Sequence, residues 1–253
     1  MDTSTEYKSL IKKQIQEEFK DLSFNEEEHR YFVGEEEFIP VSYKLKKFYK
    51  PFDKNIANYV AKRDNTTAKE VLKKWDEIGA TAAKEGTEVH EFAENYALRK
   101  IKNIDLDDKL AGKKIAAICY LEKMFTVDVK LLPELRMYHK LYKFAGTADL
   151  VWITDKGLVI DDYKTNTDLF KAYGYLLKPF ANLENNSFNK YQLQLSHYKM
   201  MIEQITGIEV YKTRIIHLKP YSYKIYETED FSEKLKEYYE NRRTYTKGPI
   251  SLF

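Results

Sequence analysis

One stretch, FAGTADLVWITDKGLVIDDYKTN at residues 144–166, constrains the fold more than any other part of the chain. It holds two apolar runs separated by the turn residues TDKG, which is the pattern of two antiparallel strands joined by a tight loop. Apolar residues precede the acids in both TADL and LVIDD, so the pattern indicates buried acids rather than a solvated strand edge. We therefore predict a β-hairpin that carries charged side chains into the protein.

The placement of these charges follows from the alternation of side chains across a strand. A two-residue loop at positions 155–156 places Asp149 directly opposite Asp162. A loop at positions 156–157 moves the pairing but keeps the parity. Both registers put Asp149, Asp162 and Lys164 on one face of the hairpin.

A loop of odd length would bring Asp161 and Tyr163 to that face instead. In either case, two carboxylates that approach each other repel unless positive charge lies between them. Lys164 supplies one positive charge, and a divalent cation that prefers oxygen ligands, such as Mg²⁺, would supply more. The alternative interpretation is a surface hairpin with an ordinary salt bridge.

The composition limits the class of protein and its surroundings. The chain has 253 residues, 43% hydrophobic and 32% charged, which is typical of a soluble globular protein. The net charge of +2 predicts no partner by itself. A single cysteine, Cys119, excludes an internal disulfide and an iron–sulfur cluster built on four cysteines. We expect no signal peptide and no membrane span, and a reducing, intracellular location.

The remaining pattern predicts an α/β fold made as one compact unit. We expect a break between two helices near Lys84–Gly86, with Thr87 capping the second. Residues 166–188 look irregular. The other expected elements are helices over 6–20, 54–100, 108–126, 188–206 and 230–243, a hairpin turning near Gly34, and strands over 131–138, 143–154, 157–165, 209–218 and 221–228.

Five short motifs occur in an order that resembles the PD-(D/E)xK nuclease superfamily, in particular its RecB-like exonuclease branch. They are GTEVHEFAE (86–94), LPELRMY (132–138), GTADL (146–150), DYKT (162–165) and QLSHY (194–198). The segment HRYFVGEEEFIPVS also resembles the N-terminal hairpin of phage-encoded and mitochondrial genome-maintenance relatives. The resemblance implies a restriction-endonuclease-like core, residues 86–253, with a central mixed β-sheet flanked by helices. Residues 1–85 would add N-terminal helical and hairpin elements packed on this core.

The same resemblance implies a metal centre. His90, Asp149 and Asp162, with the main-chain carbonyl of Tyr163, correspond to the ligands of one or two Mg²⁺ or Mn²⁺ ions. Lys164 corresponds to the catalytic lysine, which would position the attacking water and stabilise negative charge in the transition state. Mn²⁺ suits an imidazole ligand at least as well as Mg²⁺ does.

Two glutamates are expected next to this centre. Glu94 follows His90 by one helical turn and would orient the imidazole or a water molecule. Glu134 would touch metal-bound waters, and the alternative is a strand-edge acid paired with Arg136 or Lys140. For His90 itself, the alternative is a core histidine with satisfied hydrogen bonds.

A further set of residues is expected to contact DNA, either single-stranded or at duplex ends. Gln194 and Tyr198 are four residues apart on one helix and correspond to the family's Q-x-x-x-Y pair. Thr165 would contact phosphate. Lys190 and Tyr191 would extend a strip for stacking and phosphate binding, with ordinary helix surface as the alternative.

Together these features predict a divalent-metal-dependent DNA exonuclease acting in recombination, repair or replication. A structure-specific or restriction-type endonuclease of the same fold is one alternative. A non-catalytic protein that binds DNA or a recombination or replication partner is another. The expected setting is the cytoplasm of a bacterial or phage-infected cell. The sequence leaves the oligomeric state, strand preference and polarity open.

Overall fold

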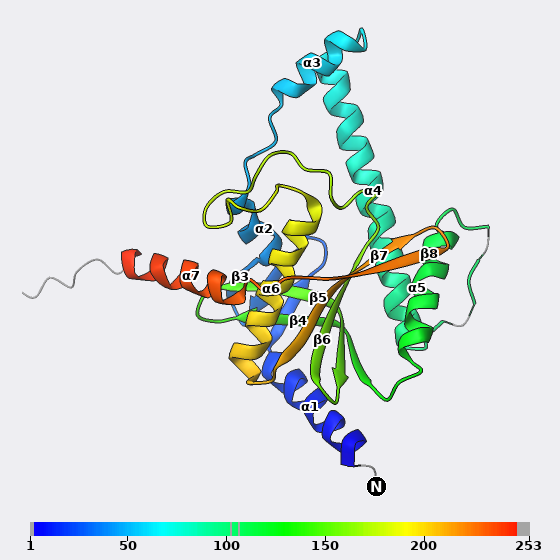
Figure 1. Ribbon diagram of the computed structural model, residues 1–253, viewed down its shortest axis with the longest axis vertical. Helices are drawn as coiled ribbons and strands as arrows, with labels where there is room; N and C mark the ends of the chain where they lie inside the picture. The colour runs from blue at the N-terminus through cyan, green and yellow to red at the C-terminus, as the bar shows by residue number, and fades with distance from the viewer. Residues whose placement is uncertain (1–2, 102, 106, 247–253) are drawn as a thin grey trace, which may run out of the picture.

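The protein is an α/β molecule, shown in Figure 1 as a computed structural model that describes residues 3–101, 103–105 and 107–246. A mixed, open eight-stranded sheet forms the centre, and helices cover both of its faces. This confirms the predicted α/β class with a mixed sheet between helices. The strands are β1 (Leu22–Asn25), β2 (Arg30–Val33), β3 (Glu36–Pro40), β4 (Lys130–His139), β5 (Phe144–Thr154), β6 (Gly157–Lys164), β7 (Val210–Lys219) and β8 (Ser222–Glu227).

The sheet forks beside β5. β4 pairs along the whole of one edge of β5, so β3 and β6 share the other edge. β3 pairs in parallel with Phe144 and Ala145, whereas the antiparallel ladder with β6 runs from Leu150 to Thr154. Between them, residues 146–149 of β5 have no ladder partner on that edge. The ladder on this edge of β5 is therefore interrupted at the GTAD segment, which leaves an opening for side chains.

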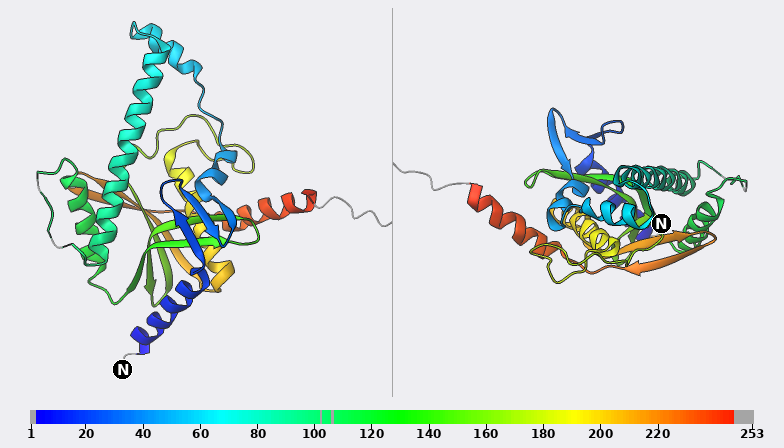
Figure 2. Two further views of the ribbon diagram at one scale, coloured as in Figure 1. Left: turned by 180° about the vertical axis from the view of Figure 1, so that it is seen from behind. Right: turned by 90° about the horizontal axis from the view of Figure 1, so that it is seen from above.

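Two hydrophobic layers hold the sheet. On one face lie α1 (Thr3–Phe19), α2 (Val41–Leu45), α6 (Ser187–Thr206) and α7 (Ser232–Thr246), packed over a core that includes Ile15, Phe144 and Leu195. On the opposite face lie α5 (Ala111–Met124) and the C-terminal half of α4 (Ala68–Ala97), packed over Trp152, Tyr120 and Val89. A short 3₁₀ helix, η1 (Lys46–Phe48), follows α2. Figure 2 shows these two layers from behind and from above.

α4 is one continuous helix of 30 residues, so the predicted break near Lys84–Gly86 is wrong. Thr67 rather than Thr87 caps its start, because Thr67 and Glu70 form a reciprocal capping box. Thr87 instead donates a hydrogen bond from its hydroxyl to the Ala83 carbonyl, 3.1 Å away. The division expected at residues 85–86 falls inside this helix, and residues 247–253 of the expected core lie outside the described residues.

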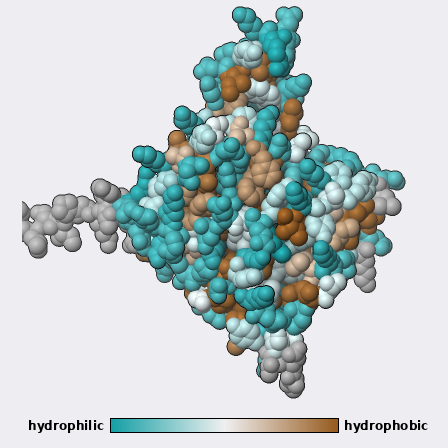
Figure 3. Space-filling model, in the orientation of Figure 1, coloured by the Kyte–Doolittle hydropathy of each residue, from teal (hydrophilic) through white to brown (hydrophobic). Residues whose placement is uncertain are grey.

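The N-terminal half of α4 and α3 (Asn55–Arg63) project from the body of the molecule (Figures 1 and 2). They share a small core of their own, which includes Ala57, Ala61 and Val71. Figure 3 shows hydrophobic residues at the surface of this projecting arm, and further hydrophobic patches lie among hydrophilic residues on the body below it. Because the arm packs on itself, the middle of α4 stays exposed between the arm and the sheet.

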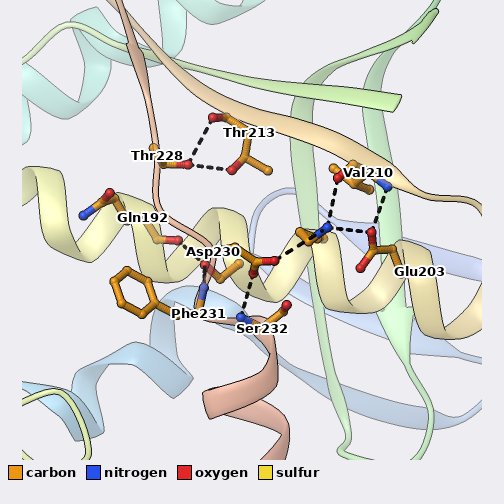
Figure 4. Close-up of polar contacts among 10 residues, drawn as sticks. Gln192, Glu203, Val210, Thr213, Thr228, Asp230, Phe231 and Ser232 are labelled. Atoms are coloured by element: carbon orange, nitrogen blue, oxygen red, sulfur yellow. Dashed lines mark hydrogen bonds and ion pairs between the residues drawn. The ribbon is translucent and has the colours of Figure 1, made fainter. Parts of the chain in front are cut away.

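Helix α6 is held at both ends and along its length. The Asn186 side chain caps its start, and Gly207, with φ 70°, ends it in the left-handed conformation that suits glycine. Figure 4 shows the polar contacts that tie this helix to β7 and to the chain leading into α7. Glu203 Oε1 accepts hydrogen bonds from Val210 N at 2.8 Å and from Lys199 Nζ at 2.6 Å. These bonds fix the face of α6 that approaches the fork.

The expected irregular stretch is confirmed, since residues 166–186 contain no helix or strand beyond one isolated bridge between Tyr175 and Glu184. The predicted hairpin at Gly34 is confirmed as β2–β3, with Gly34 at φ 59°. Across the described ranges, no helix combines the length and the apolar character needed to cross a membrane.

Candidate active site

The two aspartates of the charged hairpin meet at the fork. Leu150 pairs with Asp161 and Thr154 with Gly157, which is the register expected for a loop at 155–156. Beyond Leu150 the ladder ends, and the Asp149 side chain replaces it by accepting a hydrogen bond from the Tyr163 N–H at 2.6 Å. Since N–H and C=O of one strand residue point to the same edge, the Tyr163 carbonyl also faces the fork.

His90 reaches this point from α4, 59 residues earlier in the chain than Asp149. Its Nδ1 lies 3.3 Å from Asp149 Oδ2, and the imidazole is 25% exposed. Val89 and Ala93 on the buried face of α4 pack against the sheet, so the helix presents His90 at the edge of that contact. The alternative of an ordinary core histidine does not describe this residue, because its partner is a carboxylate at an opening in the sheet.

Lys164 lies on the same side of β6 as Asp162. Its ammonium forms an ion pair with Asp162 Oδ2, and it also lies 4.5 Å from the centre of the Tyr191 ring on α6. Both members of the pair are largely buried, with 13% of the lysine side chain and 2% of the aspartate side chain exposed. Asp162 Oδ2 receives no hydrogen bond of regular geometry from the described residues. The carboxylate is thus held by charge and is short of donors.

The electrostatics reflect crowding of buried acids. Burial raises the pKa of Asp162 to about 6, with repulsion from Asp149 adding to the shift and Lys164 opposing it. Burial also acts to raise the pKa of Asp149, but His90, Lys164 and the Tyr163 N–H together outweigh it and lower the pKa. For His90 and Lys164, burial lowers the pKa, yet the adjacent carboxylates raise it by more. The neighbouring acids therefore favour the charged forms of both bases.

Glu134 lies at the position of β4 opposite Asp149, between the pairs Pro133–Leu150 and Leu135–Ala148. Its backbone has φ 48°, in the left-handed region that is uncommon for residues other than glycine. Burial raises the pKa of Glu134 to about 8, and Asp149 adds to this shift. Such strain costs about 1–3 kcal/mol and clusters at functional sites.

The ion pair expected for Glu134 as a plain strand acid is not formed. Arg136 approaches Glu26 instead, at 3.6 Å. Glu94 is close enough to Glu134 to raise its pKa, so the two glutamates border the same opening. Six expected site residues therefore gather here: His90, Glu94, Glu134, Asp149, Asp162 and Lys164.

Within the described ranges, no three histidine, cysteine, aspartate or glutamate side chains are already arranged around a common point for a metal ion. The reason lies in the pairing just described, because Asp149 turns to His90 and Asp162 turns to Lys164. The donor set nevertheless suits a hard divalent cation. It offers carboxylate oxygens, one main-chain carbonyl and one imidazole, and it includes the buried oxygen Asp162 Oδ2, which is held by its ion pair with Lys164.

Gln194 and Tyr198 lie on the face of α6 that meets the fork, and Gln194 Nε2 donates to the Tyr198 hydroxyl at 2.7 Å. The Tyr198 ring is buried and crosses β5 at Gly146, where an added Cβ would lie 2.6 Å from ring atom Cε1. Only glycine leaves room for the ring. A direct DNA contact was predicted for Tyr198, and this burial does not support it; the ring holds Gln194 in place instead.

The remaining expected DNA contacts surround the mouth of the site. Thr165 and Tyr191 line a cavity of about 470 Å³ next to Lys164, together with residues of α4 and α5. The Tyr191 hydroxyl donates to Asn166 Oδ1 at 3.0 Å. Lys190 lies outside this cavity, with its ammonium 4.5 Å from the Tyr49 ring centre.

The sequence analysis did not predict three residues of this cavity, which are Lys113 of α5 and the small residues Ala82 and Ala83 of α4. Nothing in the local pattern marks them, because Lys113 sits in an ordinary amphipathic helix. Asn166 was also missed, although it directly follows the DYKT motif.

Comparisons with known proteins do not indicate a function, so the geometry and chemistry of the site are the main evidence about function. No protein-family model matches the chain, and no curated protein matches it. A solved structure titled "Crystal structure of SSO0001" aligns with a TM-score of 0.29 and 13% identity, over 64% of this chain and 86% of that one. A similarity of this size carries no argument about fold or activity.

Proposed function

We propose that the protein is a divalent-metal-dependent DNA exonuclease that hydrolyses phosphodiester bonds in recombination, repair or replication. The observation that supports this most strongly is the convergence of His90, Asp149, Asp162 and Lys164 at one opening. They come from α4, β5 and β6, and the sheet fork gives them a common space. An imidazole, two buried acids and an amine in this arrangement suit phosphoryl chemistry better than structural support.

In this proposal Asp149 and Asp162 hold the cation, with His90 and the Tyr163 carbonyl as further ligands. A divalent ion such as Mg²⁺ or Mn²⁺ would supply Lewis-acid stabilisation of the phosphate and a lower pKa for water. The Lys164 ammonium stays charged beside Asp162 and is placed to orient water and to neutralise the negative transition state.

Glu134 and Glu94 border the same opening and act on the arrangement of water and of His90. The Tyr163 N–H fixes the Asp149 carboxylate, so the acid is already oriented before a ligand arrives. Gln194, held by Tyr198, together with Thr165, Tyr191 and Lys190, would meet the DNA backbone and bases near the reacting phosphate. We place this activity in a reducing cell interior, bacterial or phage-infected.

Two alternatives differ in their products. An endonuclease of the same fold would use the same residues but cut within a strand. A protein that only binds DNA or a recombination or replication partner would keep the fold without needing Lys164. The buried lysine–acid pair favours the enzyme, because a binding surface gains little from an ion pair with only 2% of the acid exposed.

The test is incubation of the purified protein with end-labelled linear DNA and with covalently closed circles. Each substrate is combined with Mg²⁺, Mn²⁺ or EDTA. We expect metal-dependent shortening of linear DNA, no cutting in EDTA and intact circles. Cleavage of circles would identify an endonuclease, and absence of any cleavage with either metal would leave the binding protein as the better description.

A further inference from the structure

We infer that the cavity beside Lys164 is a binding site for one unpaired nucleotide of the DNA strand, with Lys113 of α5 as its phosphate contact. This inference rests on the proposed nuclease function and names the form of DNA that enters. It adds a residue from a helix that carries none of the five sequence motifs.

The cavity is built from four separate parts of the chain. α4 contributes Ala82, Ala83 and Gly86, and the segment after β6 contributes Thr165 and Thr167. α5 contributes Lys113, and α6 contributes Tyr191. α4 and α5 lie side by side in Figures 1 and 2. Residues of both helices line the cavity together with Lys164.

Its size fits one nucleotide. A volume of about 470 Å³ is within the ~300–1,000 Å³ range of small-molecule sites. A base-paired segment does not fit such a space, so a nucleotide that enters it must be unpaired. The small side chains at Ala82, Ala83 and Gly86 let a ligand lie close to the helix, and an added Cβ at Gly86 would already lie 3.5 Å from Thr165 Oγ1.

Lys113 differs from the two neighbouring lysines in how it is paired. Lys114 forms ion pairs with Asp108 and with Glu88, the latter at 2.7 Å. Lys109 donates to Glu85 Oε1 at 3.0 Å. Lys113 lies 4.0 Å from Glu85 Oε2, which is too long for a hydrogen bond, although only 21% of its side chain is exposed.

A partly buried ammonium without a hydrogen-bond partner is costly unless an anion joins it. Glu85 also lines the cavity, but Lys109 already binds it. Lys113 and Lys164 are the lysines of the lining, and the hydroxyls of Thr165 and Thr167 lie among them. Two ammonium groups with hydroxyl donors match a phosphate group. The far wall is rigid, because Asn166 is bound by Tyr191 and its carbonyl lies 2.6 Å from His217 Nε2.

The experiment measures binding of a fluorescent single-stranded oligonucleotide in EDTA, over a series of salt concentrations. Lys113→Ala should weaken binding by about tenfold or more, as expected for one charge-assisted hydrogen bond. The slope of log affinity against log salt should fall by ~0.7, the value for one phosphate contact to a single strand. Lys123→Ala, at an exposed position of α5 outside the lining, is the matched control and should leave both quantities unchanged.

A second pair of variants tests the space itself. Ala83→Trp fills the cavity and should weaken binding of the single strand, whereas Thr81→Trp, on an exposed position outside the lining, should not. A blunt duplex of the same sequence, with its end cross-linked so that it cannot fray, should bind equally to wild type and to both lysine variants.

The outcomes separate this site from the proposed activity. If wild type cuts DNA with metal but Lys113→Ala and Ala83→Trp bind and cut like wild type, the nucleotide site is wrong and the nuclease stands. Equal losses for Lys113→Ala and Lys123→Ala would reduce the effect to general surface charge and overturn the inference. Cavity-specific losses of binding in a protein that cuts nothing would keep the site and overturn the nuclease.

Discussion

Asp161 and Asp162 are neighbours on β6, yet their surroundings are opposite. Asp161 faces the α5 side, where Arg214 donates to it twice, at 2.7 and 2.8 Å, and Trp152 donates at 2.5 Å. The Tyr120 hydroxyl donates to it as well. Asp162 faces the fork, where its Oδ2 is paired with the Lys164 ammonium and has no further partner among the described residues.

The difference shows how one strand serves two purposes. A fully bonded buried acid locks β6 to β5, to β7 and to α5, and so contributes to stability and position. A buried acid that is short of donors is costly to fold around, which is typical of groups kept for a ligand or for chemistry. Substitution of Asp161 should therefore lower mainly stability, and substitution of Asp162 should lower mainly activity.

The largest effect is expected on stability from Asp161→Asn. Removing the charge leaves the Arg214 guanidinium buried without its partner, so unfolding free energy should fall by about 3–5 kcal/mol. In the matched control, Asp162→Asn, the unfolding free energy should fall by only about 1 kcal/mol. Lys164 still has the Asp149 carboxylate as a neighbour, and the repulsion between the two acids is relieved. Urea unfolding followed by circular dichroism measures both. Equal losses of unfolding free energy in the two variants would contradict the proposed difference between Asp161 and Asp162.

On the fork side, Lys164→Ala should lower the rate of metal-dependent DNA cleavage by about 10²–10³-fold, the cost of removing one charge-stabilising donor. The unfolding midpoint should stay close to wild type, because Lys164 acts on the reacting phosphate and is not needed to hold the strands together. Lys171→Ala, at an exposed position, serves as the control. Loss of folding together with cleavage would make Lys164 a structural residue like Arg214.

A third buried group, His197 on α6, extends the comparison to a neutral side chain. Its Nδ1 lies 2.6 Å from the Leu193 carbonyl and its Nε2 lies 2.8 Å from the Tyr239 hydroxyl, so the imidazole is fully paired without a charge. Burial lowers the pKa of His197 from 6.5 to about 4.

Because the unfolded chain takes up this proton near pH 6.5 and the folded protein only near pH 4, the contribution of His197 is complete above pH 6.5. It is lost as the pH falls to 4, by ~3 kcal/mol in total. Urea midpoints of wild type and His197→Gln across this window measure the effect, and the variant should show the weaker pH dependence. Parallel curves would mean that folding leaves the pKa of His197 unchanged.

The smallest effect is expected at Gly146. An alanine there places its Cβ 2.6 Å from the Tyr198 ring, and the ring or β5 must move, at a cost of about 1–3 kcal/mol in unfolding free energy. The same shift should disturb Gln194, which Tyr198 holds, and so weaken DNA binding. Gly79→Ala, in open space on α4, is the control. An unchanged midpoint in Gly146→Ala would show that the fork is looser than its packing indicates.

Much of the hairpin could be predicted from local pattern. Its register, the buried acids and the opposite orientation of Asp161 all follow from period-two alternation and a two-residue loop. The helix of His90 was predicted, but its continuity was not, because Gly86 is tolerated inside a long helix that packs on one side only. The burial of Tyr198 could not be foreseen, since it depends on a glycine 52 residues earlier on another element.

By itself, the sequence determined which side chains share a face, because alternation along a strand and periodicity along a helix are local properties of the backbone. Only the tertiary structure decided which faces meet. The sheet fork at residues 146–149, the approach of α4 to β5 and the position of Lys113 beside the cavity all depend on packing between distant segments. Packing of this kind follows from the shape of the whole core, which no short stretch of residues specifies.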